Sequence, residues 1–318
     1  MREWDNQAFH ILSLDGGGIK GLFSATVLAK LEEDLGVAVT DHFDLIVGTS
    51  TGGIIALGLG MGMRPRELVR FYVEKGPKIF RSPLGLKSLT HWVHRKFSPS
   101  PLRKALQECF GDKRLADCTT RLVIPSYNLG EDDVYLFKTP HHERLKRDYK
   151  VPLWKVGLAT SAAPTYFPAF GELDSLRLID GGVWANNPTM VGIVEAVSLL
   201  RVPLQNITVL SIGTSDPVTY RSGWLDWGGK LAWAKSAVAV NVIMRGQSLG
   251  VQKQAVHLLG EDKIARLDPR VPEGLFTLDR LTTDELLSKA AHESRVFSPM
   301  FERMFLSHKA SRYEPVYS

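Results

Sequence analysis

The sequence predicts an α/β fold in which helices cover both faces of a mostly parallel β-sheet. Short apolar stretches alternate with stretches of helical periodicity along the 318 residues, which is the pattern of a parallel sheet. The second apolar stretch, Phe43–Val47, shows no polar alternation, as expected of a strand that is buried on both faces. The chain has no evident repeat, low-complexity segment or linker, so we expect one compact domain with a helical C-terminal part.

The first half of the chain opens with a predicted strand at Ile11–Asp15, which runs into three glycines. The helix after them has leucine and alanine on one face and ends at Gly36, a residue type favoured just beyond a helix. The strand Phe43–Val47 runs through GTSTG into a helix of small residues. Pro65 suits the first turn of the next helix, which reaches about Glu74.

The second half of the chain continues the alternation. Strands are expected at Arg121–Ser126, Val134–Lys138, Leu176–Asp180 and Ile207–Gly213. Helices are expected at Leu153–Ala163, Pro188–Leu200 and Trp224–Leu259, and from Thr282 onward. Pro164 stops the first of these helices, and Thr282 with Glu285 matches a capping box at the start of the last.

The composition excludes several classes of protein. With 44% hydrophobic and 23% charged residues, the chain is an ordinary globular protein rather than a disordered one. Its net charge of +5 favours anionic surfaces only weakly. Two cysteines, Cys109 and Cys118, indicate neither a disulfide framework nor a metal site. The N-terminus lacks the apolar core of a signal peptide, and Leu45–Met63 is too rich in glycine, serine and threonine for a membrane span. We therefore expect a cytoplasmic protein.

The strongest local motif is GTSTG, residues 48–52, which matches G-x-S-x-G between a predicted strand and a predicted helix. Gly48 and Gly52 permit a tight, strained turn there. Such a turn presents Ser50 at the C-terminal edge of the sheet and at the N-terminus of a helix. The alternative is a glycine-rich turn without chemistry. The strand–turn–helix setting favours a nucleophile.

A nucleophilic serine needs a base, and the sequence offers two candidates. Ser50, Asp180 and His257 follow the Ser-Asp-His order of the α/β-hydrolases. That fold places several strands before its serine, whereas only two precede Ser50, and His257 lies in the middle of a predicted helix. Asp180 ends an apolar strand, and Gly181 and Gly182 let a backbone pass close to it. Its carboxylate could take the serine proton directly.

The glycine loop after the first strand, Gly16–Gly21, matches G-x-G-x-x-G. A dinucleotide site would need an acidic residue at the end of the second strand. Asp41 and Asp44 precede or open that strand, and its end runs into GTSTG. Since the first two strands end at the same edge of a parallel sheet, the amides of Gly16–Gly18 are better explained as an oxyanion hole for chemistry at Ser50.

The motifs DGGGIKG, GTSTG and DGG, in this order and setting, resemble those of the patatin-like phospholipases, a family of acyl hydrolases. The family pattern is D-G-G-G-x-[R/K]-G, then G-x-S-x-G, then D-G-[G/A], and the chain meets it without a departure. The resemblance implies a three-layer α/β/α fold. It assigns residues 9–192 to a patatin-like catalytic domain and residues 193–318 to a mainly helical part that completes the same domain.

The resemblance also implies roles for the motif residues. It implies a Ser–Asp dyad without histidine, in which Ser50 is the nucleophile and Asp180 is the base. Lys20 takes the basic position of the first motif, where it would hold the loop or favour an anionic substrate. The oxyanion hole would be lined by Gly16, Gly17 and Gly18. The supporting motif glycines are Gly48, Gly52, Gly181 and Gly182.

The family cleaves ester bonds of glycerophospholipids and other acyl lipids and needs no calcium. No carboxylate cluster in the sequence resembles a calcium loop, and we expect no metal and no other cofactor. The sequence therefore predicts a serine acyl hydrolase of the phospholipase A type, which acts on membrane phospholipid through an acyl-enzyme. The alternatives are a Ser-His-Asp esterase and a catalytically inactive module that binds lipid or nucleotide. The inactive module is disfavoured because no catalytic position is missing.

A basic segment lies between Glu74 and Glu108, which enclose no other acidic residue. Aromatic and aliphatic residues are interleaved with its cations, a composition that suits the interface of an anionic bilayer. The cations are Lys75, Lys78, Arg81, Lys87, Arg95, Lys96, Arg103 and Lys104. The residues alone also allow a solvated basic face over ordinary core, and the resemblance favours a membrane-docking lid. We expect peripheral membrane contact when the enzyme is active.

The short form of the chain also resembles the bacterial patatin-like effectors of antiphage systems, which a cyclic oligonucleotide switches on. This resemblance implies a cyclic oligonucleotide as activator, although the chain has no nucleotide-binding motif outside its catalytic elements. We expect no nucleic-acid polymer as a partner. The sequence leaves open whether the chain forms a homo-oligomer and which ester position it prefers.

Overall fold

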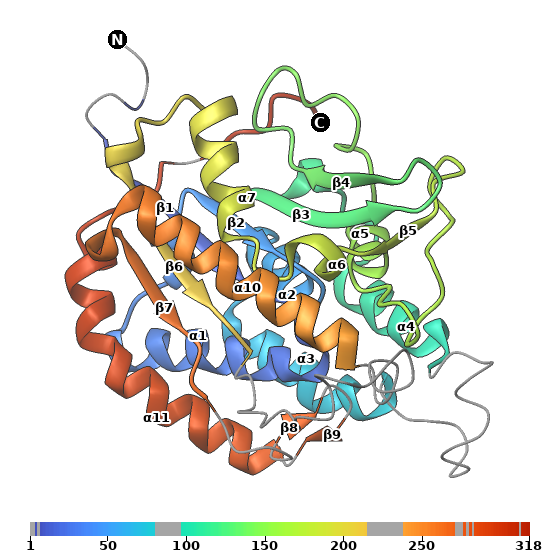
Figure 1. Ribbon diagram of the computed structural model, residues 1–318, viewed down its shortest axis with the longest axis horizontal. Helices are drawn as coiled ribbons and strands as arrows, with labels where there is room; N and C mark the ends of the chain where they lie inside the picture. The colour runs from blue at the N-terminus through green and yellow to red at the C-terminus, as the bar shows by residue number, and fades with distance from the viewer. Residues whose placement is uncertain are drawn as a thin grey trace, which may run out of the picture.

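Five parallel strands form the centre of the fold in this computed structural model (Figure 1). They are β1 (Phe9–Leu14), β2 (Leu45–Gly48), β3 (Arg121–Asn128), β6 (Ile207–Ile212) and β7 (Ile264–Leu267). The sheet order is β4-β3-β2-β1-β6-β7, with β4 (Asp133–Lys138) antiparallel at one edge. The structure describes residue 4 and residues 7–79, 97–214, 238–270, 276–277, 280–281, 283–311 and 313–318.

The central strands are buried on both faces, because alternate side chains enter two separate hydrophobic cores. Along β1, Ile11 packs into one core, while Leu12 and Leu14 pack into the other. The same division separates Val209 from Leu210 in β6. All residues of these two strands are buried, as expected for a parallel sheet between two layers of helices.

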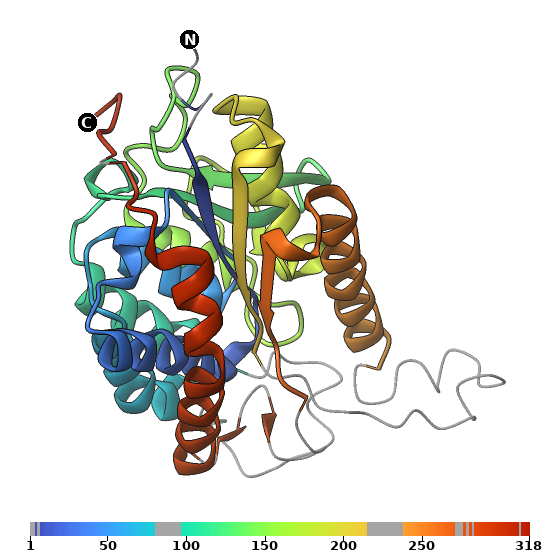
Figure 2. The same ribbon diagram turned by 90° about the vertical axis from the view of Figure 1, so that its left-hand side faces the viewer.

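The helices form a layer on each face, which the side view in Figure 2 separates. The larger core lies under α1 (Gly21–Leu35), α2 (Thr51–Gly60), α3 (Pro65–Ile79), α4 (Pro99–Phe110), α5 (Leu153–Thr160) and α11 (Thr283–Phe301). The opposite face carries α7 (Thr189–Val194), its π-helical continuation η5 (Glu195–Leu199) and α10 (Val238–Leu259). α6 (Gly182–Ala185) joins the sheet to this second layer.

Short elements complete the described chain. The strands β8 (Phe276–Thr277) and β9 (Arg280–Leu281) pair with each other. The short turns of helix are η1 (Gly18–Lys20), η2 (Val39–His42), η4 (Leu115–Asp117), η6 (Leu204–Asn206), η8 (Glu261–Lys263) and the π-helical η9 (Glu302–Leu306). Among the residues that the structure describes, no helix is both long and apolar enough to cross a bilayer.

The third strand, β3, brings two distant segments end to end. β4 occupies one side of β3 along residues 123–128. On the other side, the start of β3 pairs in parallel with β2, up to the pair Val47–Val123. The end of β3 pairs antiparallel with β5 (Leu178–Asp180), and Ser126 faces Asp180. β2 and β5 therefore point at each other, and the residues that follow them meet above Ile124 and Pro125 of β3.

The predicted fold class is confirmed, and most strands lie within two residues of their expected bounds. The helices α4 and α6 and the strands β7, β8 and β9 were not predicted. β5 is shorter than expected and runs against the parallel strands, because it pairs antiparallel with β3. The helix expected at Trp224–Leu259 is described from Val238 onward, and its first part lies outside the described residues.

Candidate active site

The turn between β2 and α2 holds Ser50 in a backbone conformation that is rare for a side chain other than glycine, with φ 55° and ψ −120°. Such a conformation costs on the order of 1–3 kcal/mol and persists only where the surroundings hold it. The Ser50 amide donates to Thr160 Oγ1 at 3.0 Å, and the Thr160 hydroxyl donates to the Pro125 carbonyl at 2.6 Å. On the other flank, Thr49 Oγ1 donates to the Ala185 carbonyl at 2.6 Å. The hydrogen bonds to Thr160 and to Ala185 thus hold the strained turn on both of its flanks.

The two glycines of the GTSTG motif are needed for close packing. A Cβ on Gly48 would come within 2.3 Å of the Gly52 carbonyl oxygen. A Cβ on Gly52 would come within 2.3 Å of the Leu14 carbonyl oxygen and 2.7 Å of that of Asp15. These glycines therefore let α2 start directly against the end of β1, which brings Ser50 beside the glycine loop.

Asp180 is the hydrogen-bond partner of the serine. Ser50 Oγ donates to Asp180 Oδ2 at 2.7 Å, and the Gly182 amide donates to Asp180 Oδ1, also at 2.7 Å. Burial of the carboxyl group raises its pKa to about 6, and the two hydrogen bonds oppose this rise. Asp180 is thus ionised at neutral pH, yet it is a stronger base than a carboxylate in water.

The glycine loop lies at the C-terminal end of β1 and leads through η1 into α1. Gly17 and Gly18 line the cavity in which Ser50 and Asp180 lie. Gly16 has a structural contact instead, because its amide donates to the Asn186 carbonyl at 3.0 Å. A Cβ on Gly17 would come within 2.3 Å of the Thr214 side chain, so the loop packs closely against the end of β6. Two of the three predicted oxyanion glycines therefore face the cavity.

A largely buried ion pair connects the glycine loop to β7. Arg266 of β7 donates through both terminal nitrogens to Asp15, at 2.9 and 2.6 Å. The same guanidinium also bonds Ser211 Oγ at 2.7 Å and Asp268 Oδ2 at 2.9 Å. Two-point pairing of a guanidinium and a carboxylate fixes orientation as well as distance. Sequence reasoning missed Arg266 because no motif surrounds it and its partner lies 251 positions away.

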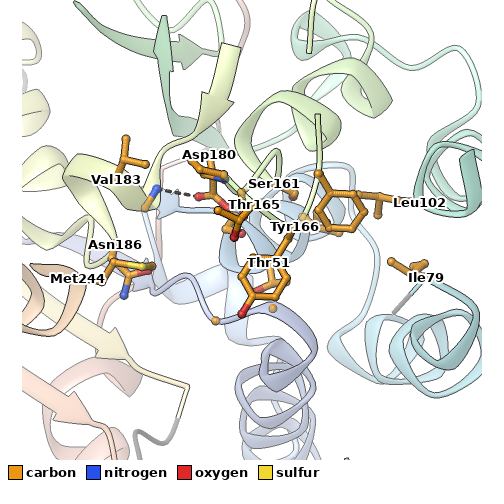
Figure 3. Close-up of a pocket in the computed structure, with 18 of the residues that line it drawn as sticks. Thr51, Ile79, Leu102, Ser161, Thr165, Tyr166, Asp180, Val183, Asn186 and Met244 are labelled. Atoms are coloured by element: carbon orange, nitrogen blue, oxygen red, sulfur yellow. Dashed lines mark hydrogen bonds between the residues drawn. The ribbon is translucent and has the colours of Figure 1, made fainter. Parts of the chain in front are cut away.

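An apolar cavity of about 280 Å³ opens above the serine. Figure 3 shows Asp180 between Asn186 and Met244 on one side and Ile79 and Leu102 on the other. The remaining wall consists mainly of Ile54, Phe71, Tyr72, Ala163, Pro164, Tyr166, Phe167, Val183 and Ile243. These side chains come from α2, α3, α4, α6, α10 and the loop after α5. Such a wall suits a hydrocarbon chain and excludes water from the reacting groups.

The other motif residues support the site from outside the cavity or at its edge. Lys20 is 5% exposed and is not part of the cavity wall, which favours the loop-holding role over contact with an anionic substrate. A Cβ on Gly181 would come within 2.4 Å of the Pro125 carbonyl oxygen, so this glycine permits the contact between β3 and β5. Gly182 borders the cavity and donates to Asp180.

The geometry contradicts two of the alternatives, namely a Ser-His-Asp triad and a dinucleotide-binding glycine loop. His257 is exposed near the end of α10, about 20 Å along the helix axis from Met244 of the cavity wall. A Ser-His-Asp triad with His257 is therefore wrong. The glycine loop is not a dinucleotide site, because Asp44 lies at the N-terminal ends of the parallel strands and the loop lies at their C-terminal ends. The Asp44 carboxylate accepts instead from the His10 amide and from His308.

The predicted docking segment is described only at its two ends, since residues 80–96 lie outside the described chain. Lys75 pairs with Glu108 at 2.5 Å, and Arg103 pairs with Glu172. Lys104 is largely exposed, and its Nζ lies 4.0 Å from Glu108. Three of the described cations therefore lie beside a carboxylate, which reduces the positive charge that these ends of the segment present.

A strained serine at a strand–helix turn, beside a buried carboxylate and an apolar cavity, is an arrangement suited to a serine hydrolase. Comparison with known proteins identifies the family to which the chain belongs. The sequence profile of the patatin-like phospholipases matches residues 12–193, more than half of the chain. The chain belongs to the patatin-like phospholipase family and is a lipid acyl hydrolase.

Several relatives match over most of the chain. The cGAMP-activated phospholipase of Pseudomonas aeruginosa is 35% identical over 317 residues, which cover 95% of this chain and 93% of that protein. The cGAMP-activated phospholipase of Vibrio cholerae is 32% identical and covers 92% of this chain and 91% of its own length. The patatin-like protein 4 of Arabidopsis thaliana is 34% identical over 64% of this chain and 59% of its own length.

The pKa of Asp180 generates a prediction about stability. A carboxyl group whose folded-state pKa is raised contributes most to stability below its unfolded pKa of about 4, and this contribution is lost as the pH rises through about 6. Asp180→Asn cannot ionise and has nearly the same shape. We expect it to be more stable than the wild type by about 1–3 kcal/mol at pH 7.5 and equal to it near pH 4. Chemical denaturation at the two pH values measures both differences, and a less stable variant at pH 7.5 would contradict the raised pKa.

Proposed function

We propose that this chain is a phospholipase of the A type, which cleaves ester bonds of membrane glycerophospholipids through a Ser50–Asp180 dyad and an acyl-enzyme. The observation that carries the proposal is the 2.7 Å hydrogen bond from Ser50 Oγ to the buried Asp180 carboxylate, at the base of an apolar cavity. Because the nucleophile already points its proton at a base, the pair is arranged for the first step of acyl transfer.

In the first half-reaction, Ser50 Oγ attacks the ester carbonyl carbon while its proton passes to Asp180 Oδ2. The carbonyl oxygen takes up negative charge, and the amides of Gly17 and Gly18, two residues that line the cavity, would stabilise it. The amide of Thr51, at the N-terminus of α2, is a further donor because the first turn of a helix leaves its amides unpaired. Collapse of the tetrahedral intermediate expels the lysophospholipid alkoxide, which takes from Asp180 the proton that came from Ser50.

In the second half-reaction, water enters and Asp180 removes its proton as the oxygen attacks the acyl-enzyme. Collapse of the second intermediate releases the fatty acid and returns the proton to Ser50 Oγ. Asp180 is suited to both transfers, because a carboxyl group with a pKa of about 6 accepts a proton readily and returns it readily near neutral pH.

The cavity supports a lipid substrate. Its wall is mainly aliphatic and aromatic, and no charged side chain other than Asp180 belongs to it among the described residues. The cavity would take part of an acyl chain, and the polar headgroup would remain outside. We include peripheral contact with an anionic membrane in the proposal, on the basis of the basic segment between Lys75 and Lys104 and the apolar side chains of Val183 and Ile243, which are exposed at the mouth of the cavity.

A cyclic dinucleotide would activate the enzyme. Two relatives that match more than nine-tenths of this chain are named cGAMP-activated phospholipases. A lipase that stays inactive until a cyclic dinucleotide appears would suit an effector of an antiphage system, which is the role that the sequence resemblance implies.

The dyad is tested by single and double substitutions. Ser50→Ala and Asp180→Asn should each reduce phospholipid hydrolysis to the background rate. The double variant should be little worse than either single variant, because a nucleophile and its only base act as one unit. His257→Ala serves as the control and should stay within about twofold of wild type. The measurement is fatty-acid release from vesicles, and wild-type turnover by Ser50→Ala would rule out the mechanism.

The pH dependence of the reaction should follow Asp180. Protonated Asp180 cannot accept the Ser50 proton, so kcat/KM should fall as the pH drops below about 6 and should level off above it. A soluble short-chain ester is the appropriate substrate, since vesicle binding has its own pH dependence. A flat profile between pH 5 and 8, with the protein still folded, would be inconsistent with Asp180 as the base.

Activation is tested by lipid mass spectrometry of vesicles incubated with the protein and a panel of cyclic dinucleotides. We expect cGAMP to increase lysophospholipid formation by about tenfold or more, in the range usual for coupling between sites. Ser50→Ala should give no product under any condition. Equal rates with and without every member of the panel would refute activation while leaving the phospholipase activity intact.

A further inference from the structure

Three polar atoms in the wall of the catalytic cavity lack a hydrogen-bond partner. Among the residues that the structure describes, the buried unpaired side-chain atoms include Thr51 Oγ1, Ser161 Oγ and Asn186 Oδ1. All three residues line the cavity above Ser50. A buried polar atom without a partner costs about 1–3 kcal/mol, so a group of them in one cavity indicates that the substrate supplies their partners.

Of these residues, Asn186 has a side chain that ends near both Ser50 and Asp180. A methyl group placed on Gly16 would contact Asn186 Oδ1 at 2.7 Å and Ser50 Cβ at 3.2 Å. A methyl group on Gly182 would come within 3.3 Å of Asn186 Oδ1 and 3.0 Å of Asp180 Oδ1. The end of the Asn186 side chain is therefore separated from the Ser50 side chain, and from the Asp180 carboxylate, by no more than the space of about one methyl group.

The main chain and side chain of Asn186 are held on several sides. Its amide donates to Gln247 Oε1 at 2.8 Å, and its carbonyl accepts from the Gly16 amide at 3.0 Å. Its side-chain Nδ2 donates to Ser248 Oγ at 3.1 Å. Asn186 thus connects α10 to the glycine loop. The structure provides the fixed position that a donor in an active site needs.

The neighbouring asparagine, Asn187, does not have an unpaired side-chain atom. Asn187 Oδ1 accepts from the Thr189 amide at 3.0 Å, and Asn187 Nδ2 donates to the Ser248 carbonyl at 3.4 Å. Both ends of the Asn187 amide are therefore used within the protein. Asn186, with the same side chain one position earlier, keeps one end for the cavity.

The end of the Asn186 amide that faces the cavity decides what it can bind. A carbonyl oxygen there would repel the oxyanion of a tetrahedral intermediate. Rotation by 180° about the last side-chain bond exchanges the two ends and presents Nδ2 to the cavity. The Ser248 hydroxyl can donate as well as accept, so it would keep its bond to Asn186 in either orientation. The rotation therefore removes the repulsion without the loss of a hydrogen bond.

We propose that Asn186 is a catalytic residue, whose Nδ2–H donates to the oxyanion together with the amides of Gly17 and Gly18. This inference rests on the proposed acyl transfer at Ser50. When Ser50 Oγ attacks, the π electron pair of the ester carbonyl moves onto its oxygen, and Asn186 stabilises that charge while keeping its proton. When the intermediate collapses, the electron pair returns to re-form the carbonyl, and the leaving alkoxide takes its proton from Asp180.

The test compares Asn186→Asp and Asn186→Ala with wild type on two substrates, in the presence of cGAMP. Asn186→Asp keeps the shape and removes the donor, whereas Asn186→Ala removes the side chain without adding charge. One substrate is p-nitrophenyl butyrate, which has an ester carbonyl but no headgroup, and the other is a vesicle phospholipid. We expect kcat to fall by about 10²–10³ with a nearly unchanged KM, and by the same factor on both substrates.

Gln247→Ala is the matched control, because it removes the bond from α10 to the Asn186 backbone and leaves the side-chain amide in place. It should reduce kcat by no more than about threefold. Melting temperatures identify any variant that has lost its fold, and the two Asn186 variants provide independent readings. Wild type and Ser50→Ala are assayed together with them, so that an inactive wild type is recognised as a failure of the proposed function.

Three results would overturn the inference while the proposed function stands. In the first, a folded Asn186 variant keeps kcat within about threefold of wild type. In the second, the loss is confined to phospholipid, which would make Asn186 a headgroup contact. In the third, Gln247→Ala loses as much activity as the Asn186 variants, which would make the connection to α10 the function of this residue.

Discussion

β2 and β5 lie end to end along the same side of β3, and the positions of Ser50 and Asp180 follow from this arrangement. β2 brings Ser50 to the junction from one direction, and β5 brings Asp180 from the other. Two glycines make the junction narrow enough, because a side chain at Gly48 or Gly181 would collide with backbone. The hydrogen bond between Ser50 and Asp180 is thus a consequence of strand pairing, and strand pairing is a rigid constraint.

The junction is costly in isolation and is supported by the rest of the fold. Ser50 has a strained backbone, and Asp180 is a buried carboxyl group with a raised pKa. Thr160 holds the amide of Ser50, and the pair Arg266–Asp15 fixes the glycine loop beside it. These contacts come from α5 and β7, so the site depends on a helix over one face of the sheet and on the strand at the end of the sheet. Backbone strain and buried charge are common at active sites, where chemistry requires a particular geometry and the rest of the fold offsets the loss of stability.

In the proposed function, the apolar cavity links substrate recognition to catalysis. The same side chains that would receive an acyl chain also exclude water from Asp180, and this burial raises its pKa to about 6. Low polarity further strengthens each hydrogen bond to a developing oxyanion. Low polarity also raises the free-energy cost of a polar atom without a hydrogen-bond partner. The unpaired end of the Asn186 side chain therefore indicates a contact with substrate.

The sequence by itself determined the fold class, nearly all the central strands, the family and the motif residues Ser50, Asp180 and Gly16–Gly18. It could do so because apolar runs and motif glycines are local signals. Only the tertiary structure decided that β5 runs antiparallel, that the Gly16 amide is engaged by Asn186, that His257 is remote and that Arg266 fixes Asp15. These features depend on pairing between residues up to 251 positions apart, and no local pattern in a single chain records which distant residues will meet.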